Sequence, residues 1–137
     1  MKPKAGIAAA LMIGIALILL IACSNGDGRA DDRGMIVVLA PILSVEVQVA
    51  ESFPPQYFLQ VESGLPNGCV EFDGYEVERR GETITVSVTN LEPADRDTPC
   101  TEIYRTVMTS IPLGSDFESG RTYTVLVNDV TETFSAQ

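Results

Sequence analysis

The sequence contains no histidine and no tryptophan, and its only lysines, Lys2 and Lys4, stand at the N-terminus. Without histidine the chain cannot build a Ser-His-Asp or Cys-His nucleophile system. Beyond residue 4 there is no lysine to act as a base. No glycine-rich loop follows a strand and opens a helix, so nucleotide binding has no support. These absences predict that the protein is not an enzyme and that it uses no cofactor.

Carboxylates are the remaining side chains that could catalyse a reaction. Glu71 and Asp73 are spaced two residues apart, as are Glu76 and Glu78. On a strand this spacing puts each pair on one face. Paired carboxylates can hydrolyse glycosides, but such a face is usually solvated. We therefore expect both pairs to lie at the surface without a catalytic role.

The charge balance excludes one class of partner. The 137 residues include 19 acidic and 9 basic ones, a formal net charge of −10. Removal of residues 1–22 would take both lysines with it and leave a net charge near −12. Phosphate backbones are bound by clustered Lys and Arg, so we expect no nucleic acid as a partner. Direct adsorption to anionic lipid headgroups is disfavoured for the same reason.

The N-terminus carries the clearest signal. After the two lysines, residues 5–22 contain no charged or hydrogen-bonding side chain, which is the pattern of a signal peptide. The run is long enough for an uncleaved transmembrane helix, and that alternative stays open on length alone. The residues Leu20-Ile21-Ala22-Cys23 resemble the lipobox of bacterial lipoproteins, in which aliphatic and small residues precede an obligatory cysteine.

That resemblance implies a series of modifications. A diacylglycerol would be attached to Cys23 through a thioether, residues 1–22 would be removed, and the new amino group would be acylated. Lasting attachment to a membrane takes more than one acyl chain, so the protein would be lipid-anchored to the cell membrane or the outer membrane, facing the periplasm or the cell exterior. Ser24 stands where the family's inner-membrane retention signal would place Asp, which favours an outer membrane if the organism has one.

The lipobox also explains the odd number of cysteines. With Cys23 acylated, Cys69 and Cys100 remain as one pair in an oxidising compartment, where disulfides persist. A metal site or a redox pair are the alternatives, but zinc takes about four ligands and no histidine is present. We predict a structural disulfide, which stabilises the fold by about 3–4 kcal/mol in the chain-entropy model.

Residues 23–34 are polar and rich in turn-forming residues, so we predict a lipid-anchored flexible tether. From Met35 onward the apolar period is two. Residues 35–39 form a short apolar run that predicts a buried first strand, and alternation recurs at residues 45–49, 57–61, 83–89 and 107–113. Gly, Pro, Asn and Asp punctuate these runs. The pattern predicts an all-β fold: a small immunoglobulin-like antiparallel β-sandwich of about 7–8 strands with one disulfide, spanning residues 35–137.

The immunoglobulin-like part of this prediction comes from residues 113–127. They resemble the strand, turn and strand of immunoglobulin-like and fibronectin-type sandwiches that carry a tyrosine corner, in which a Tyr hydroxyl bonds backbone upstream. Tyr123 takes that position, and Phe117 stands where such folds often have Leu. The resemblance covers about 15 residues, and Tyr123 as an ordinary core aromatic is the alternative.

The residue spacing predicts the register of the last hairpin. If Asn128 and Asp129 form a two-residue turn, then Val127 faces Val130, Val125 faces Glu132 and Tyr123 faces Phe134. Glu132 would then be an inward-facing charge on the last strand, a common guard against edge-to-edge aggregation.

Two segments are candidates for contact with a ligand. Glu92–Asp97 is the densest acidic loop, which predicts a solvated turn more than a calcium site, since the spacing is not that of an EF-hand. Phe53–Phe58 combines aromatics with prolines, which marks either a contact surface or the start of a core strand, and we favour the strand. We expect a non-catalytic binding or scaffold module of unknown ligand, with a protein or envelope partner. A protease-inhibitor-like sandwich is the alternative.

Overall fold

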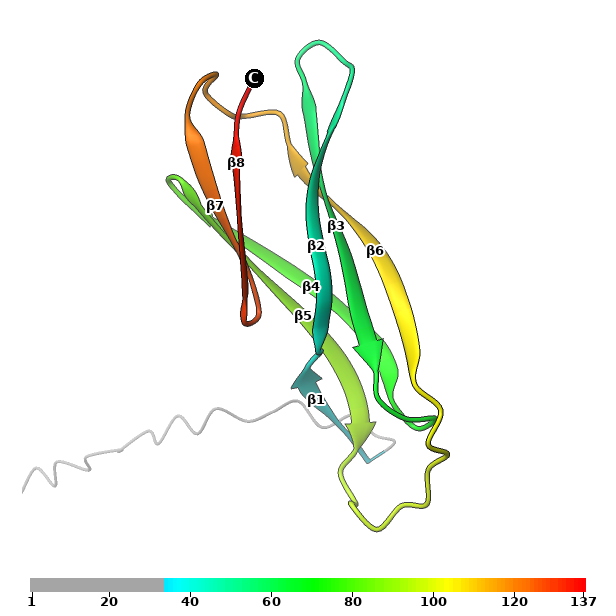
Figure 1. The fold of residues 1–137 in the computed structure, drawn as a ribbon. Coiled ribbons are helices and arrows are strands. Elements are labelled where there is room, and N and C mark those ends of the chain that lie inside the picture. The colour runs from blue at the N-terminus through cyan, green and yellow to red at the C-terminus, as the bar shows by residue number, and fades with distance from the viewer. Residues whose placement is uncertain (1–33) are drawn as a thin grey trace, which may run out of the picture.

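The period-two segments form eight β-strands in the computed structural model, which describes residues 34–137 (Figure 1). The predicted signal peptide, Cys23 and all of the tether except Gly34 lie outside the described residues. Within residues 34–137 there is no helix that could cross a bilayer. The strands are β1 (Met35–Leu39), β2 (Ile42–Ala50), β3 (Gln56–Leu65), β4 (Glu71–Arg80), β5 (Thr83–Pro93), β6 (Arg105–Gly114), β7 (Thr122–Val127) and β8 (Val130–Ser135).

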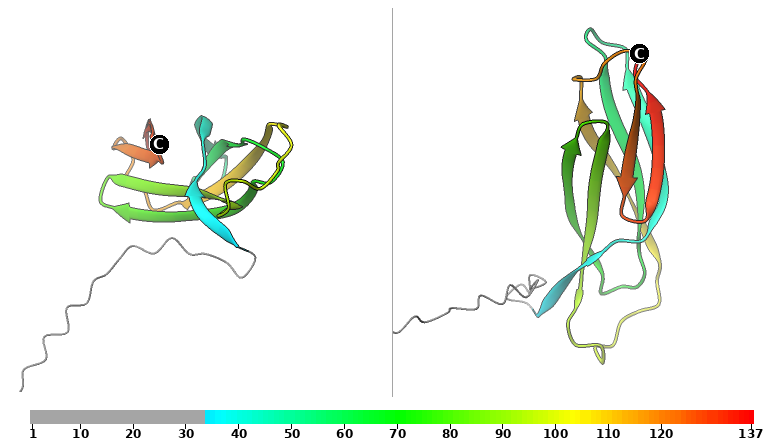
Figure 2. Two further views of the ribbon diagram at one scale, coloured as in Figure 1. Left: turned by 90° about the horizontal axis from the view of Figure 1, so that it is seen from below. Right: turned by 90° about the vertical axis from the view of Figure 1, so that its left-hand side faces the viewer.

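The strands form two sheets, which lie face to face as separate layers in Figure 2. One sheet has the order β2-β3-β6. In the other sheet, β5 is the central strand. One of its edges pairs with β4, and the other pairs with β7 over its first part and with β1 over its last part. β8 pairs with the far edge of β7. The predicted all-β sandwich with one disulfide is confirmed. All strand pairs are antiparallel except β5 and β7, which run parallel, and periodicity within a strand carries no information on its neighbour's direction.

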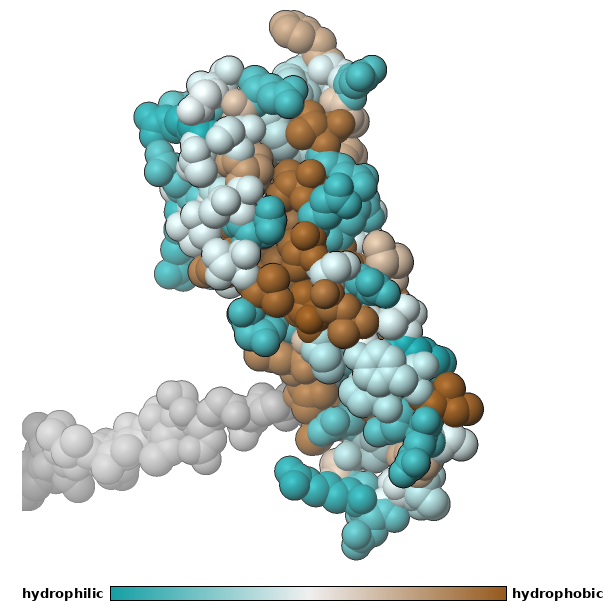
Figure 3. Space-filling model, in the orientation of Figure 1, coloured by the Kyte–Doolittle hydropathy of each residue, from teal (hydrophilic) through white to brown (hydrophobic). Residues whose placement is uncertain are grey.

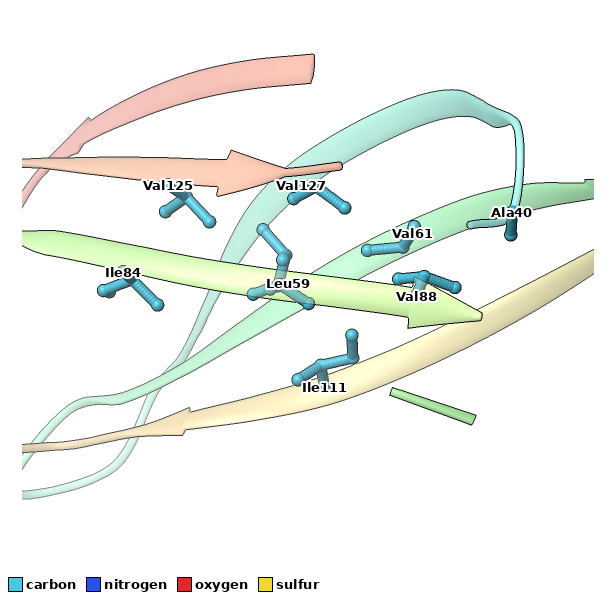
Figure 4. Close-up of a cluster of buried hydrophobic side chains, with 9 residues drawn as sticks. Ala40, Leu59, Val61, Ile84, Val88, Ile111, Val125 and Val127 are labelled. Carbon is cyan, nitrogen blue, oxygen red and sulfur yellow. The ribbon is translucent and has the colours of Figure 1, made fainter. Parts of the chain in front are cut away.

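The core lies between the layers and comes mainly from β3, β5 and β7 (Figure 4). Leu59 and Val61 face Ile84, Val86 and Val88 across it, all of them 0–1% exposed. Successive side chains of a strand point to opposite faces. Apolar residues at every second position of β3 and β5 therefore all face the core. Full burial of such side chains stabilises the fold by about 1.5–3 kcal/mol each.

The first strand is less buried than its apolar run predicted. Met35–Val38 are half-buried and Leu39 is 63% exposed. The reason is topological, since β1 bonds only the last part of β5 and has no second neighbour in the sheet. A strand at a sheet's margin is covered on one side only.

The side chain of Asn128 fills the gap where β5 changes partner. Residues 83–86 of β5 bond β7 and residues 89–93 bond β1, which leaves Val88 at the junction. Asn128 Oδ1 accepts a hydrogen bond from the Val88 N–H at 3.0 Å, and Asn128 Nδ2 donates to the carbonyls of Val88 and Ala40 at 2.9 and 2.8 Å. The side-chain amide thus bonds the backbone groups of Val88 that a neighbouring strand would otherwise bond. Its own φ is +49°, a conformation that asparagine tolerates well.

The last hairpin has the predicted register, with Val127 opposite Val130, Val125 opposite Glu132 and Tyr123 opposite Phe134. Tyr123 and Phe134 stack at 5.5 Å in an aromatic cluster that also contains Tyr57 and Phe117. The Tyr123 hydroxyl accepts a hydrogen bond from the Glu118 N–H at 3.0 Å. This cluster packs one end of the sandwich.

A disulfide joins loops at the other end. Cys69 and Cys100 are bonded with 5.5 Å between their Cα atoms, which confirms the predicted pair. Beside it the Gly68 N–H donates to the Thr101 carbonyl at 2.8 Å. A Cβ at Gly68 would lie 2.0 Å from Thr101 Oγ1, so any other residue there would force the Thr101 side chain to move. We call this the disulfide end.

Candidate functional site

The segment Phe53–Phe58 is divided between surface and core. Tyr57 is buried at 1% exposure, as the core-strand interpretation predicted, whereas Phe53 is fully exposed. That interpretation is therefore wrong for Phe53. Pro54 and Pro55 have no N–H to give to a ladder, so β3 begins only at Gln56 and Phe53 stays in the β2–β3 loop. Figure 1 shows this loop at the end of the molecule opposite to the start of β1.

The loop that presents Phe53 is braced locally. Ser52 Oγ donates a hydrogen bond to the Pro54 carbonyl at 2.9 Å, and the Ser52 N–H donates to the Ala50 carbonyl at 2.9 Å. The Phe53–Pro54 peptide bond is cis. Proline has a fixed φ, so two successive prolines limit the conformations open to the loop. The Phe53 ring is therefore exposed to solvent on a loop whose backbone has few accessible conformations.

A shallow pocket lies beside this loop. It has a volume of about 320 Å³ and is lined by Val49, Ala50, Glu51, Ser52, Pro55 and Gln137. The Gln137 N–H donates to the hydroxyl of buried Tyr57 at 2.8 Å, which holds the chain's last residue against the base of the loop. We call Phe53 together with this pocket the distal site.

A second pocket lies at the disulfide end and contains the predicted acidic loop. Its volume is about 450 Å³, and it is lined by Asn67, Glu92, Pro93, Asp95, Arg96, Thr98, Cys100 and Glu102. Asp95 Oδ1 accepts the Asp97 N–H at 3.0 Å, and the Asp95 carbonyl accepts the Thr98 N–H at 3.2 Å. These bonds form a turn whose residues 94–99 are exposed. In residues 34–137 no three His, Cys, Asp or Glu side chains are placed to hold a metal ion.

The paired carboxylates lie on β4, at the margin of its sheet. Glu71, Asp73, Glu76 and Glu78 are all exposed. Thr89 Oγ1 donates to Asp73 at 2.9 Å, and Arg80 pairs with Glu78 at 2.7 Å. Neither pair lines the distal site or the disulfide-end pocket. Their positions fit charged residues on a solvated strand.

Charged contacts hold the loops around the aromatic cluster. The guanidinium of Arg79 lies 4.4 Å from the centre of the Phe117 ring and donates to the Asp116 carbonyl at 2.6 Å. Arg121 pairs with Glu82 and Glu118. The hydrogen bond that Arg121 donates to Glu82, and then the charge of Glu118, raise the pKa of Arg121. Exposed pairs of this kind add little stability, but they connect the β4–β5 turn to the β6–β7 loop.

Sequence reasoning missed three of these contacts: the Asn128 amide, the Arg79 stacking and the Gln137–Tyr57 bond. Each joins residues at least 38 positions apart. Pattern within a segment cannot reveal such pairs. Only Phe53 carried a local signal, because the two prolines that follow it have no N–H to donate to a ladder.

Comparison with known proteins places the fold in a family. The profile of the ORF11 beta-sandwich domain matches residues 59–136, more than half of the chain. An "uncharacterized 10.2 kDa protein in HgiCIIM 5' region" of Herpetosiphon aurantiacus is 35% identical over 91 residues, which cover 66% of this chain and 94% of that protein. A second protein of that organism, named for the HgiBIM 5' region, is 35% identical over 81 residues, 59% of this chain and 95% of its own length. No solved structure matches. The chain belongs to the ORF11 beta-sandwich domain family.

Proposed function

We propose that this member of the ORF11 beta-sandwich family is a lipid-anchored, non-catalytic binding module that meets a protein partner through its distal site. The observation that carries the proposal is Phe53, a fully exposed aromatic side chain on a braced loop. Support for the anchor comes from the lipobox ending at Cys23. Support for a non-catalytic role comes from the lack of histidine and from the solvated positions of the paired carboxylates.

The placement of the two ends favours this assignment. Gly34 lies at the disulfide end, where its carbonyl accepts the Ala94 N–H at 2.9 Å. An anchor on Cys23 would be eleven residues away, a span on the order of 20 Å for a flexible chain. The disulfide end would then face the membrane. The β2–β3 loop, at the opposite end in Figure 1, would face outward, where a partner can reach it.

The chemistry of the distal site suits a protein surface. Burial of a Phe side chain contributes about 1.5–3 kcal/mol, and an aromatic anchor that enters a partner's pocket is a common source of binding energy. Because the loop is already restricted, little further ordering is lost on binding. Glu51 beside the pocket favours a partner whose apolar pocket has a basic rim.

Kinship with immunoglobulin-like or fibronectin-type sandwiches is part of the same proposal. It is supported by the bond from the Glu118 N–H to the Tyr123 hydroxyl, the kind of upstream backbone contact that a tyrosine corner makes. In such sandwiches the loops at the two ends carry the contacts while the sheets hold the frame.

Site-specific photo-crosslinking tests the proposal in the full chain expressed in its own membrane. A benzoyl-phenylalanine would replace Phe53 in one variant and Met108, which is 64% exposed on β6, in a matched control. We expect a discrete crosslinked band from position 53. An excess of unmodified protein should abolish this band by competition, whereas an excess of Phe53→Ala protein should not. Identical bands from both positions, or no band from position 53, would contradict the proposal.

The inhibitor-like alternative is favoured by the same exposed Phe53, because an apolar side chain on a braced loop suits a protease with an apolar specificity pocket. Chymotrypsin inhibition by the full chain in detergent separates the two functions. Inhibition that is lost in Phe53→Ala assigns an inhibitor. Its absence in both proteins, with the crosslink present, leaves the binding module.

A further inference from the structure

An apolar strip runs between β2 and β8, which are edge strands of different sheets. It is the brown column in the middle of Figure 3. Val45 and Val47 of β2 and Phe134 of β8 pack against the core from the strip and are half-buried, while Val49 is 38% exposed. Each strand has one bonded neighbour, β3 for β2 and β7 for β8. The two strands approach each other within 8 Å between Cα atoms, and no backbone hydrogen bond joins them.

Pockets lie at both ends of this strip. One is the pocket of the distal site, which begins at Val49. The other, of about 350 Å³, is lined by Leu39, Ala40, Pro41, Asn128 and Asp129, between the β1–β2 junction and the β7–β8 turn. The strip is thus open at both ends, as a path for an extended chain would be.

The backbone of β8 offers hydrogen bonds along the strip. In a hairpin with a two-residue turn the closing residues form a bonded pair, and bonded pairs then alternate. Val130, Glu132 and Phe134 consequently bond β7. The N–H and C=O groups of Thr131, Thr133 and Ser135 point to the opposite edge, toward the strip. Such a row is a template for another strand.

Glu132 gives this edge a chemical preference. Its side chain is half-buried on the inward face of β8, between Val130 and Phe134. Among residues 34–137 no side chain or backbone group forms an ion pair or hydrogen bond with its carboxylate. An opposite charge directly across from such a carboxylate on a neighbouring strand is favourable. A strand added to β8 would place one side chain directly opposite Glu132, with Cβ atoms about 4.5–5.5 Å apart.

We propose that the free edge of β8 binds an extended segment of a basic partner protein by strand addition, with a Lys or Arg opposite Glu132 and apolar side chains two residues to either side. A second copy of this chain is a poor occupant, because it would bring Glu132 against another acidic surface and residues 23–137 carry a net charge near −12. The chain's own tether is polar and lacks alternating apolar residues. The same carboxylate that repels copies selects a basic segment.

Strand addition requires the two sheets to part along this seam. Cα atoms of β2 and β8 approach within 8 Å, whereas a strand between them needs about 9.5 Å, twice the usual spacing. No backbone hydrogen bond opposes that separation. It would loosen the packing of Val45, Val47 and Phe134 against the core, which the apolar side chains of the added strand would have to replace. The added strand would pair the unpaired edge of β8 and cover the apolar strip. This surface adjoins the distal site at the Val49 pocket but does not include Phe53, so its binding does not depend on Phe53.

Two labelled peptides test the inference by fluorescence anisotropy with the full chain in detergent. One is Thr-Val-Thr-Lys-Thr-Val-Thr, and the other has Glu in place of Lys. We expect the Lys peptide to bind the wild-type protein about tenfold more tightly than it binds Glu132→Lys, and the Glu peptide to show the reverse preference. Phe53→Ala should leave both preferences unchanged, which separates this result from the test of the distal site.

A chemical control identifies the binding mode without altering the protein. The Lys peptide with N-methyl groups on alternate residues keeps its charge but cannot donate to β8, and it should lose binding if the backbone pairs. Hydrogen exchange at Thr131, Thr133 and Ser135 should slow when the unmodified peptide binds. Equal binding of the two peptides, unchanged binding of the methylated one, or no binding of either would overturn the inference.

Discussion

Replacement of Asn128 is the sharpest test of how the two sheets are joined. Its side chain makes three hydrogen bonds, two to Val88 and one to Ala40, at the point where β5 exchanges β7 for β1. Asn128→Ala removes all three and leaves the Val88 N–H and the Ala40 carbonyl without the partners they have in this structure. Asn128→Gly removes the same bonds but accepts the φ of +49° without strain.

The magnitudes separate the two causes. Loss of partners for two partly buried backbone groups costs about 3 kcal/mol, and a non-glycine residue in the left-handed region adds about 1 kcal/mol. We expect Gly to destabilise the fold by about 3 kcal/mol and Ala by about 4 kcal/mol. Asn128→Asp keeps the acceptor for Val88 but turns a carboxylate toward two carbonyls, so it should also be less stable than the wild type.

The assay is denaturant unfolding followed by circular dichroism, with the exposed neighbour variant Asp129→Ala as control. That control should lie within about 0.5 kcal/mol of the wild type. If Asn128→Gly is as stable as the wild type, the side-chain bonds contribute nothing and the junction is held by the backbone alone. If Gly and Ala are equally destabilised, the left-handed conformation carries no cost here.

Three further predictions follow from single features of the chain. Reduction of the Cys69–Cys100 disulfide should lower the unfolding midpoint by roughly 10–20 °C, since the bridge contributes about 3–4 kcal/mol and each kcal/mol moves a domain of this size by roughly 3–6 °C; a reduced protein with an unchanged midpoint would contradict this. Cys23→Ser should leave an unlipidated precursor, and normal processing with membrane partition would refute the anchor. Gly64→Ala places a Cβ 1.9 Å from Tyr104 Oη, so it should displace that ring and destabilise the fold in melting experiments. The same substitution in a Tyr104→Ala background should then cost less.

The sequence determined the strands and their faces. Alternation at residues 83–89 named Ile84, Val86 and Val88 as inward, and all three are buried. The register of the last hairpin followed from its two-residue turn, because a short turn leaves one pairing. The cysteine pair followed from counting. These are local properties, set by side-chain polarity, spacing and turn length within a single stretch of chain.

Only the tertiary structure decided which strands lie beside one another. The parallel neighbours β5 and β7, the unpaired edges of β2 and β8, and the junction closed by Asn128 all depend on contacts between segments 40 or more residues apart. That Glu132 has no partner among residues 34–137 is a consequence of that arrangement. Periodicity predicts which face of a strand a side chain occupies. Whether another element covers that face depends on long-range packing. The candidate binding surfaces of this protein are faces and edges that no other element within residues 34–137 covers.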